Sequence, residues 1–350
     1  MVNLLIASKE SSGKTAVCAG IGKKLLNQGK KVGYFVPVRL SETTSVSDYG
    51  DAIFMKEILE LEESPEVLSP TKLTSSQLWK SLTDSTGDFV QQVKANYARI
   101  SRGKDIVVIE GPGEIAADNV ATLACYRIAE ALDARVIAML PYTATLAPSD
   151  IKRVAEELGK RLLGVIINFV PEPKIEALKQ DLTDSFQKAG IKVLGIIPET
   201  RSLLGITVKE LAEVLSGEII TCPESTGEIV ENIMLGAMTL DSGIDYFSRK
   251  KDKAAIIRGE RPDMQLAALQ TSTKCLVLTN NAKPVANVLS EAEGKHIPIV
   301  VASKDTPGIV AVLEQALARS AFNSTNKLRK VEELLDKYLD FKSLSSALGF

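Results

Sequence analysis

The sequence has almost no histidine, and this removes several classes of catalysis at once. His296 is the single histidine among 350 residues. A Ser-His or Cys-His catalytic pair, or a metal site with two histidines, would have to use it. It precedes the apolar run IPIVVAS, where a surface histidine at the start of a strand is the simpler interpretation. We therefore expect no histidine-based catalysis.

Cysteine pairs, long apolar runs and an excess of one charge are also missing. The four cysteines form no C-x-x-C pair, so neither a zinc site nor a disulfide framework is predicted. No apolar run reaches the roughly 18–20 residues that span a bilayer, and the N-terminus lacks the basic region of a signal peptide. Lys and Arg number 42 against 44 Asp and Glu, whereas nucleic-acid binding needs clustered basic excess. We expect a reduced cytoplasmic protein that binds neither nucleic acid nor membrane.

Short apolar runs alternate with longer amphipathic stretches, which is typical of parallel strands joined by helices. Most runs are continuous Val, Ile and Leu, so both faces of the sheet should be covered. Strands are expected at 2–8, 31–38, 105–111, 134–141, 162–170 and 192–199, and helices at 14–29, 74–100, 118–132, 148–160 and 173–189. Residues 39–73 are predicted as a long loop with one helix near 52–61.

Turn residues at 216–226 separate a second α/β series from the first. This series has three predicted strands with helices between them, followed by a charged amphipathic helix near the C-terminus. The fold class is therefore α/β. A doubly wound, mostly parallel P-loop sheet is expected at 1–215, and a smaller α/β domain with a C-terminal helix at 216–350.

The strongest motif follows the first predicted strand, where Ser8 to Thr15 read Ser-Lys-Glu-Ser-Ser-Gly-Lys-Thr. In such a strand-loop-helix, backbone N–H groups and the helix N-terminus hold phosphate oxygens. Gly13 lets the backbone approach, Lys14 neutralises phosphate charge, and the Thr15 hydroxyl can ligate Mg²⁺. Ser8 replaces the first glycine of the strict G-x4-G-K-[ST] pattern, and a chance Gly-Lys-Thr is the structural alternative. The motif predicts a nucleotide site, ATP or a related nucleotide, whose binding residues include Ser11 and Ser12.

Lys9 adds a second basic group to this loop, and it makes the motif K-x-x-x-G-K-[ST]. That pattern resembles the deviant Walker A motif of MinD/ParA-type P-loop proteins, in which the extra lysine reaches a nucleotide phosphate, often across a dimer. We predict Lys9 and Lys14 as the catalytic residues. A solvated loop lysine remains the alternative for Lys9.

Three polar residues elsewhere complete the predicted site. Glu110 ends the buried strand DIVVIE, which should place its carboxylate at the sheet edge facing the phosphate loop as a Mg²⁺ partner. The following G-P-G-E-I-A also fits a weak dinucleotide fingerprint. Asn168 ends another buried strand, where its amide either reads the adenine edge or caps a turn. Asp51 opens a helix, which the helix dipole alone explains.

These motifs carry a family resemblance. Residues 1–215, with SKESSGKT, GYFVPV, GDA, VIEGPG and IIN, resemble the dethiobiotin synthetase-like P-loop fold. The segment GIIPETRSLLGITVKELAEVL is similar to one in cobyrinic acid a,c-diamide synthases and in long phosphotransacetylases. From about residue 217 onward the sequence resembles a DRTGG domain. The order of the two modules resembles the N-terminal regulatory half of long phosphotransacetylases.

The resemblance implies roles for individual residues. Thr15, Asp51 and Glu110 would bind Mg²⁺, and Lys9, Gly13 and Lys14 the phosphates, while Asn168 would contact the base. In the second domain, Gly259-Glu-Arg-Pro-Asp263 stands at the DRTGG signature. Arg261 there is a candidate anion site, with a helix-start ion pair as the alternative.

The sequence departs from these relatives in three ways. Val36 stands where dethiobiotin synthetases carry a substrate-handling lysine, which argues against dethiobiotin formation. The 350 residues leave no room for a transacetylase domain, so we expect no acetyl transfer. A glutaminase would need a Cys-His-Glu set, so glutamine-driven amidation is not expected.

Three functions follow from these observations. The first is a regulatory or sensor protein that binds Mg-ATP and forms a homodimer, with a protein partner. The second is an ATP-dependent ligase that activates a carboxylate as an acyl phosphate. The third is a structural dimer scaffold.

Overall fold

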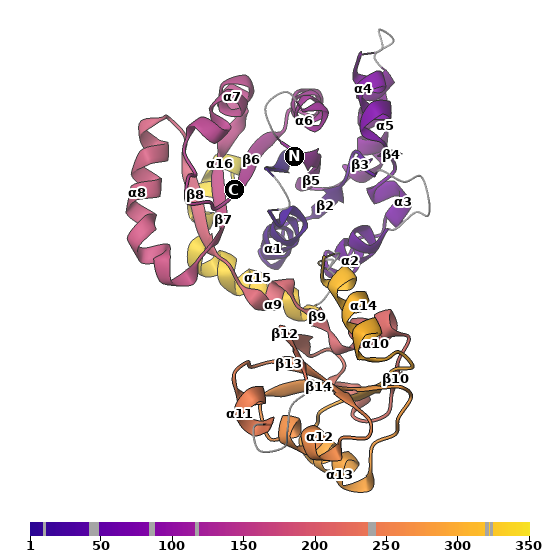
Figure 1. The fold of residues 1–350 in the computed structure, drawn as a ribbon. Coiled ribbons are helices and arrows are strands. Elements are labelled where there is room, and N and C mark those ends of the chain that lie inside the picture. The colour runs from indigo at the N-terminus through magenta and orange to yellow at the C-terminus, as the bar shows by residue number, and fades with distance from the viewer. Residues whose placement is uncertain are drawn as a thin grey trace. The chain divides into compact units, whose positions relative to one another are not determined.

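The computed structural model describes residues 1–9, 12–41, 49–83, 88–115, 119–236, 243–318, 322 and 325–350. These residues form two compact units (Figure 1). The first unit comprises Met1–Glu199 and Leu328–Phe350, and the second Thr200–Lys327.

The first unit is built on a six-stranded sheet in the order β2-β5-β1-β6-β7-β8, in which all neighbours are parallel. The strands are β1 (Val2–Ser8), β2 (Val32–Phe35), β5 (Ile106–Glu114), β6 (Arg135–Pro141), β7 (Leu162–Val170) and β8 (Val193–Pro198). The apolar residues Leu4 to Ile6 of β1 and Ile106 to Ile109 of β5 are fully buried. Both faces of the sheet are therefore covered, as the continuous apolar runs predicted.

Helices cover the two faces according to the direction of each crossover. The chain crosses the sheet one way from β1 to β2 and the other way from β5 to β8. Right-handed crossovers therefore place α1 on one face and α6, α7 and α8 on the other (Figure 1). The helices are α1 (Lys14–Asn27), α2 (Gly50–Ile58), α3 (Pro65–Leu68), α4 (Ser75–Thr83), α5 (Asp88–Ile100), α6 (Val120–Ala131), α7 (Ser149–Leu158) and α8 (Ile175–Lys188).

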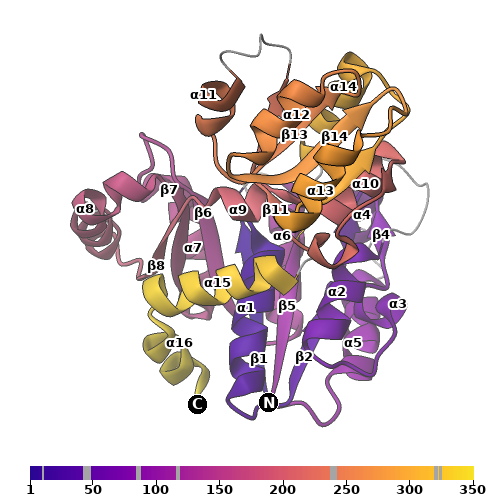
Figure 2. The same ribbon diagram turned by 90° about the horizontal axis from the view of Figure 1, so that it is seen from below.

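The last residues of the chain pack on this unit through α15 (Thr325–Tyr338) and α16 (Phe341–Leu348) (Figure 2). Gly20 of α1 makes room for them, since a Cβ atom there would lie 2.5 Å from Leu335 Cδ1. The edge strand β8 also meets this segment, because Asp340 N donates to Leu194 O at 2.7 Å. The observed grouping differs from the domain limits expected from sequence, which put the C-terminal helix with the second domain.

The second unit has a five-stranded sheet in the order β10-β15-β14-β13-β12, parallel except for the edge strand β10. Alternate residues of its central strands face two separate cores, as Ala255 and Ile257 do on one side and Ala254 and Ile256 on the other. The strands are β9 (Ile206–Thr207), β10 (Glu218–Ile219), β11 (Ile229–Val230), β12 (Asn232–Leu235), β13 (Lys253–Arg258), β14 (Thr273–Thr279) and β15 (Ile299–Val301). The helices are α9 (Arg201–Leu204), α10 (Val208–Leu215), α11 (Gly243–Ser248), α12 (Pro262–Leu269), α13 (Ala286–Gly294) and α14 (Thr306–Ala318).

The α/β fold class and most predicted elements are confirmed, and the differences are short elements. Within 39–73 the structure has α2 near the predicted position, plus α3 and a two-stranded parallel pair, β3 (Arg39–Leu40) and β4 (Lys72–Leu73). The helix predicted at 74–100 is described as α4 and α5, on either side of residues outside the described set. No helix in the described parts of the chain is both long and apolar enough to cross a membrane.

Candidate phosphate-binding site

The Gly-Lys-Thr motif lies at the carboxyl edge of the first sheet, where β1 passes into α1. Gly13 has φ +82° and ψ 36°, a left-handed conformation that glycine adopts without a Cβ penalty. The loop is anchored on both sides: Lys9 N donates to Met139 O of β6 at 2.8 Å, and Ile115 N donates to Ser8 O at 2.7 Å. The strand-loop-helix arrangement predicted from the motif is therefore present.

The Lys14 ammonium is held inside this loop by two acceptors. Its Nζ donates to Ser8 Oγ at 3.0 Å and to Gly113 O, on β5, at 2.9 Å. Ser8 is fully buried. The serine at the first-glycine position thus supplies an acceptor that a glycine would lack. Neither acceptor was predicted from the sequence, and the contact with Gly113 depends on how β5 lies beside β1.

Thr15, Glu110 and Tyr34 form a connected group of oxygen atoms next to Lys14. The Thr15 hydroxyl donates to Glu110 Oε1 at 2.9 Å, and the Tyr34 hydroxyl donates to Glu110 Oε2 at 2.8 Å. The three residues come from α1, β5 and β2. The predicted pairing of Thr15 and Glu110 is thus present in the geometry, while Tyr34 was missed because nothing in its apolar strand marks it as a partner.

Burial and nearby carboxylates together act on the two protonated groups beside Glu110, the Tyr34 phenol and the Cys18 thiol. Burial first, and then the Glu110 carboxylate, raise the pKa of the Tyr34 phenol well above its usual value, so Tyr34 remains a donor. The carboxylate of Asp51, in the first turn of α2, raises that pKa further. The buried Cys18 thiol has a raised pKa for the same causes, whereas Lys14 lowers it. Asp51 therefore acts electrostatically on the group that contains Glu110.

These oxygen atoms suit a hard cation that keeps most of its ligands as water or phosphate. Thr15 supplies a hydroxyl and Glu110 a carboxylate, both preferred by Mg²⁺, which usually takes one or two protein ligands. Across the described residues, no group of three or more His, Cys, Asp or Glu could enclose a metal. The donor set fits Mg²⁺ better than a metal that is held by protein ligands alone.

Asn168 supports the phosphate loop from β7. Its Nδ2 donates to Ser12 O at 2.9 Å, and its Oδ1 accepts from Phe169 N at 2.9 Å. Ser12 also donates through its hydroxyl to Lys9 O. Asn168 is thus brought to the site as expected, and its contact with a base stays a prediction. Ser11 lies outside the described residues.

Lys9 and Arg261 each have an acidic neighbour. Lys9 Nζ lies 3.5 Å from Asp150 Oδ1, in the first turn of α7, with both side chains about one-third exposed. Arg261 precedes α12, and its guanidinium donates to Asp263 over 2.7–3.2 Å. The ion pair considered for Arg261 is present. The anion site at Arg261 and the phosphate contact of Lys9 remain predictions.

Three further expectations concern residues 111–114, His296 and the four cysteines. Residues 111–114 continue β5, so the dinucleotide fingerprint there does not form the expected turn into a helix. His296 is exposed and lies 3.6 Å from Glu224, which confirms the surface interpretation. The four cysteines are free and buried, consistent with the absence of a disulfide framework.

The phosphate loop, Lys14, Thr15 and the carboxylate on the adjacent strand define a P-loop α/β domain. The family models agree with this class. Residues 3–207, more than half of the chain, match the family described as AAA domain, so the chain belongs to that family. Residues 210–316 match the DRTGG domain.

Individual relatives point to the phosphotransacetylases. The chain is 23% identical over 372 aligned residues to the phosphate acetyltransferase of Nitratidesulfovibrio vulgaris. This alignment covers 99% of this chain and 51% of that protein. It is 25% identical over 230 residues to the probable cobyric acid synthase of Methanocaldococcus jannaschii, covering 57% of this chain and 46% of that protein. The structure of the cell division protein MinD of Aquifex aeolicus matches with a TM-score of 0.34 and 21% identity, over 58% of this chain and 85% of that chain. A TM-score this low supports no conclusion about this chain.

The chain matches these phosphate acetyltransferases along almost all of its own sequence, and it spans about half of their length. The resemblance to long phosphotransacetylases is therefore confirmed, and the order of the two domains is consistent with their N-terminal half. The more distant relative is a probable cobyric acid synthase, whereas the sequence resemblance named cobyrinic acid a,c-diamide synthases.

Proposed function

We propose that this protein is a regulatory nucleotide-binding protein whose first unit binds Mg-ATP. The observation that carries the proposal is the convergence of Lys14, Thr15 and Glu110 at the end of β1, with Thr15 and Glu110 joined at 2.9 Å. A helix N-terminus with adjacent loop N–H groups favours phosphate at this place. The DRTGG domain would serve as the regulatory and dimerising part.

The residues of the loop have distinct parts in the proposed binding. Lys14 would exchange its bonds to Ser8 Oγ and Gly113 O for phosphate oxygens, since a charged phosphate is the stronger acceptor. Thr15 and Glu110 would hold Mg²⁺, with Asp51 contributing to its field. The cation would neutralise phosphate charge when bound. Asn168 would hold the carbonyl of Ser12 through its amide, and Lys9 would leave Asp150 to reach the phosphates.

A regulatory role is favoured over dethiobiotin formation by the residue at position 36. Val36 is buried and apolar, where the resembled synthetases carry a lysine for substrate chemistry. The relatives named phosphate acetyltransferase are about twice as long as this chain, so acetyl transfer by these 350 residues is not part of the proposal.

Isothermal titration of ATP with Mg²⁺ into wild type, Lys14→Ala and Lys94→Ala tests this function. Lys94 is an exposed lysine of α5 in the same unit, and its replacement is the matched control. We expect wild type and Lys94→Ala to bind alike, and Lys14→Ala to lose at least tenfold in affinity. Failure of the wild type to bind ATP below about 1 mM would contradict the proposal.

A ligase is the second candidate, and the similarity to a probable cobyric acid synthase favours it. Lys9, Lys14 and the Thr15–Glu110 pair could neutralise charge during phosphoryl transfer. Phosphate release from Mg-ATP that rises with one small carboxylic acid would support the ligase. Binding without such release supports the regulatory protein, and light scattering tests the dimer.

A further inference from the structure

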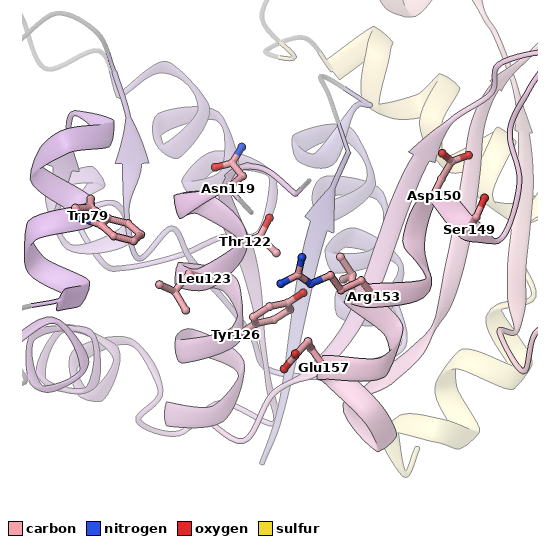
Figure 3. A pocket seen from close by; sticks show the side chains of 10 residues that line it. Trp79, Asn119, Thr122, Leu123, Tyr126, Ser149, Asp150, Arg153 and Glu157 are labelled. Atoms are coloured by element: carbon pink, nitrogen blue, oxygen red, sulfur yellow. The ribbon is translucent and has the colours of Figure 1, made fainter. Parts of the chain in front are cut away.

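A groove of about 420 Å³ lies beside α6 and α7, within the first unit. Figure 3 shows the side chains that line it, which come from α4, α6, α7 and Asn119 just before α6. This volume falls in the range of small-molecule sites, about 300–1,000 Å³. No residue of the Gly-Lys-Thr motif lines the groove.

Two facing helices supply its walls at helical spacing. Leu123 and Tyr126 lie on one face of α6, and Asp150, Arg153 and Glu157 follow one face of α7. Residues three or four apart share a helix face, so each wall is a continuous strip. Arg153 and Glu157 point from α7 toward Tyr126, whereas Asp150 lies at the N-terminal end of α7 (Figure 3).

The third wall is Trp79 of α4, the single tryptophan of the sequence. It is 56% exposed, and its ring is turned toward the groove (Figure 3). An indole provides a large flat surface for stacking, and covering it with another ring is favourable. Together with Tyr126 and Leu123 it suits a planar ligand.

The charges in the groove select among planar ligands. Asp150 and Glu157 oppose a single guanidinium, Arg153, so the ionisable lining carries one net negative charge. Partial burial, then Glu157, raise the pKa of the Tyr126 phenol, and Arg153 lowers it, so a carboxylate and a guanidinium both act on the same ring. This pair offers an acceptor and a donor to one ligand edge, while the net charge disfavours a phosphate.

We infer that the groove binds a small heteroaromatic ring that carries an amino group and no phosphate, the chemistry of an amino-purine nucleoside. The ring stacks on Trp79, its amino group donates to Glu157, and a ring acceptor receives a bond from Arg153. The inference does not rest on the proposed function, because the groove is a second site. The two sites adjoin at Asp150, which lines the groove and lies 3.5 Å from Lys9 Nζ.

Trp79 fluorescence of the full chain, titrated with adenosine, tests the inference, since no other tryptophan contributes. We expect a saturable change with half-saturation below about 1 mM. Glu157→Gln, which loses the charged acceptor, should weaken binding about tenfold or more, as should purine riboside, which lacks the amino group. Glu156→Gln is the matched control, because Glu156 is exposed on the same helix, 3.9 Å from Lys152. It should bind adenosine as wild type does.

Several results would overturn the inference. They are an unchanged Trp79 signal with no heat of binding at 5 mM adenosine, equal binding of adenosine and purine riboside, or AMP binding more tightly than adenosine. Loss of the adenosine response in Lys14→Ala would assign that response to the phosphate loop instead. A concentration-dependent Trp79 shift with a doubled mass in light scattering would show that a second copy of the chain fills the groove.

Discussion

The substitution Gly13→Ala, compared with Gly29→Ala, separates the effect of a left-handed residue on stability from the effect of the phosphate loop on ATP binding. Gly13 and Gly29 lie near opposite ends of α1 and have nearly equal φ angles, +82° and +80°. An alanine in this left-handed region costs about 1–2 kcal/mol, so both substitutions should lower the free energy of unfolding by about that amount. They differ in their surroundings: a Cβ at Gly13 would lie 3.3 Å from Asn168 Nδ2, while nothing lies within 4 Å of one at Gly29.

The added Cβ at Gly13 therefore presses on the amide that holds Ser12 O. We expect Gly13→Ala to weaken Mg-ATP binding at least tenfold and Gly29→Ala to leave it unchanged. Urea unfolding followed by Trp79 fluorescence measures stability, and calorimetry measures affinity. Equal losses of ATP affinity in the two variants, or no loss of stability in either, would refute the reasoning.

Three other predictions test the packing and charges of the two units. Tyr34→Phe removes a buried hydroxyl that donates to a carboxylate, and it should lower the free energy of unfolding in urea by about 1.5–3 kcal/mol. Tyr97→Phe removes a hydroxyl that donates to a neutral amide, and it should lower the same quantity by only about 0.5–1.5 kcal/mol. The reverse order of the two losses would contradict this assignment. Leu335→Ala should cost about 2–5 kcal/mol in the same assay, because Leu335 is buried against α1, and an unchanged urea midpoint would contradict that packing. Lys253 is fully buried, and burial lowers the pKa of its ammonium to about 8, below the value in the unfolded chain. Between pH 8 and about 10 the unfolded state therefore binds more protons than the folded state. Stability measured by circular dichroism should rise over that interval, and Lys253→Met should remove the rise.

The sequence predicted those parts of the fold that depend on local pattern. Continuous apolar runs became the buried strands β1 and β5, and the loop ending in Gly-Lys-Thr became the start of α1. The two-residue strands β3 and β4 were missed, because two residues carry no periodicity. The packing of α15 on Gly20 was missed as well, since an amphipathic helix does not say which surface it covers.

The sequence predicted which residue types form the site, but only some of the contacts between them. Thr15 and Glu110 could be paired in advance because adjacent parallel strands end at one edge. The acceptors of Lys14 could not, since the motif does not say where the ammonium points, and Gly113 reaches it from the neighbouring strand β5. The bond from Asn168 to Ser12 likewise joins residues 156 positions apart.

The Mg²⁺ dependence of ATP affinity tests the central claim most directly. Calorimetric titration of ATP into wild type and Glu110→Gln, with Mg²⁺ and with EDTA, compares the four conditions. If Thr15 and Glu110 hold the cation beside the phosphates, Mg²⁺ should raise the ATP affinity of wild type at least tenfold and that of Glu110→Gln by much less. Equal effects of Mg²⁺ in the two proteins, or no ATP binding by wild type, would contradict it.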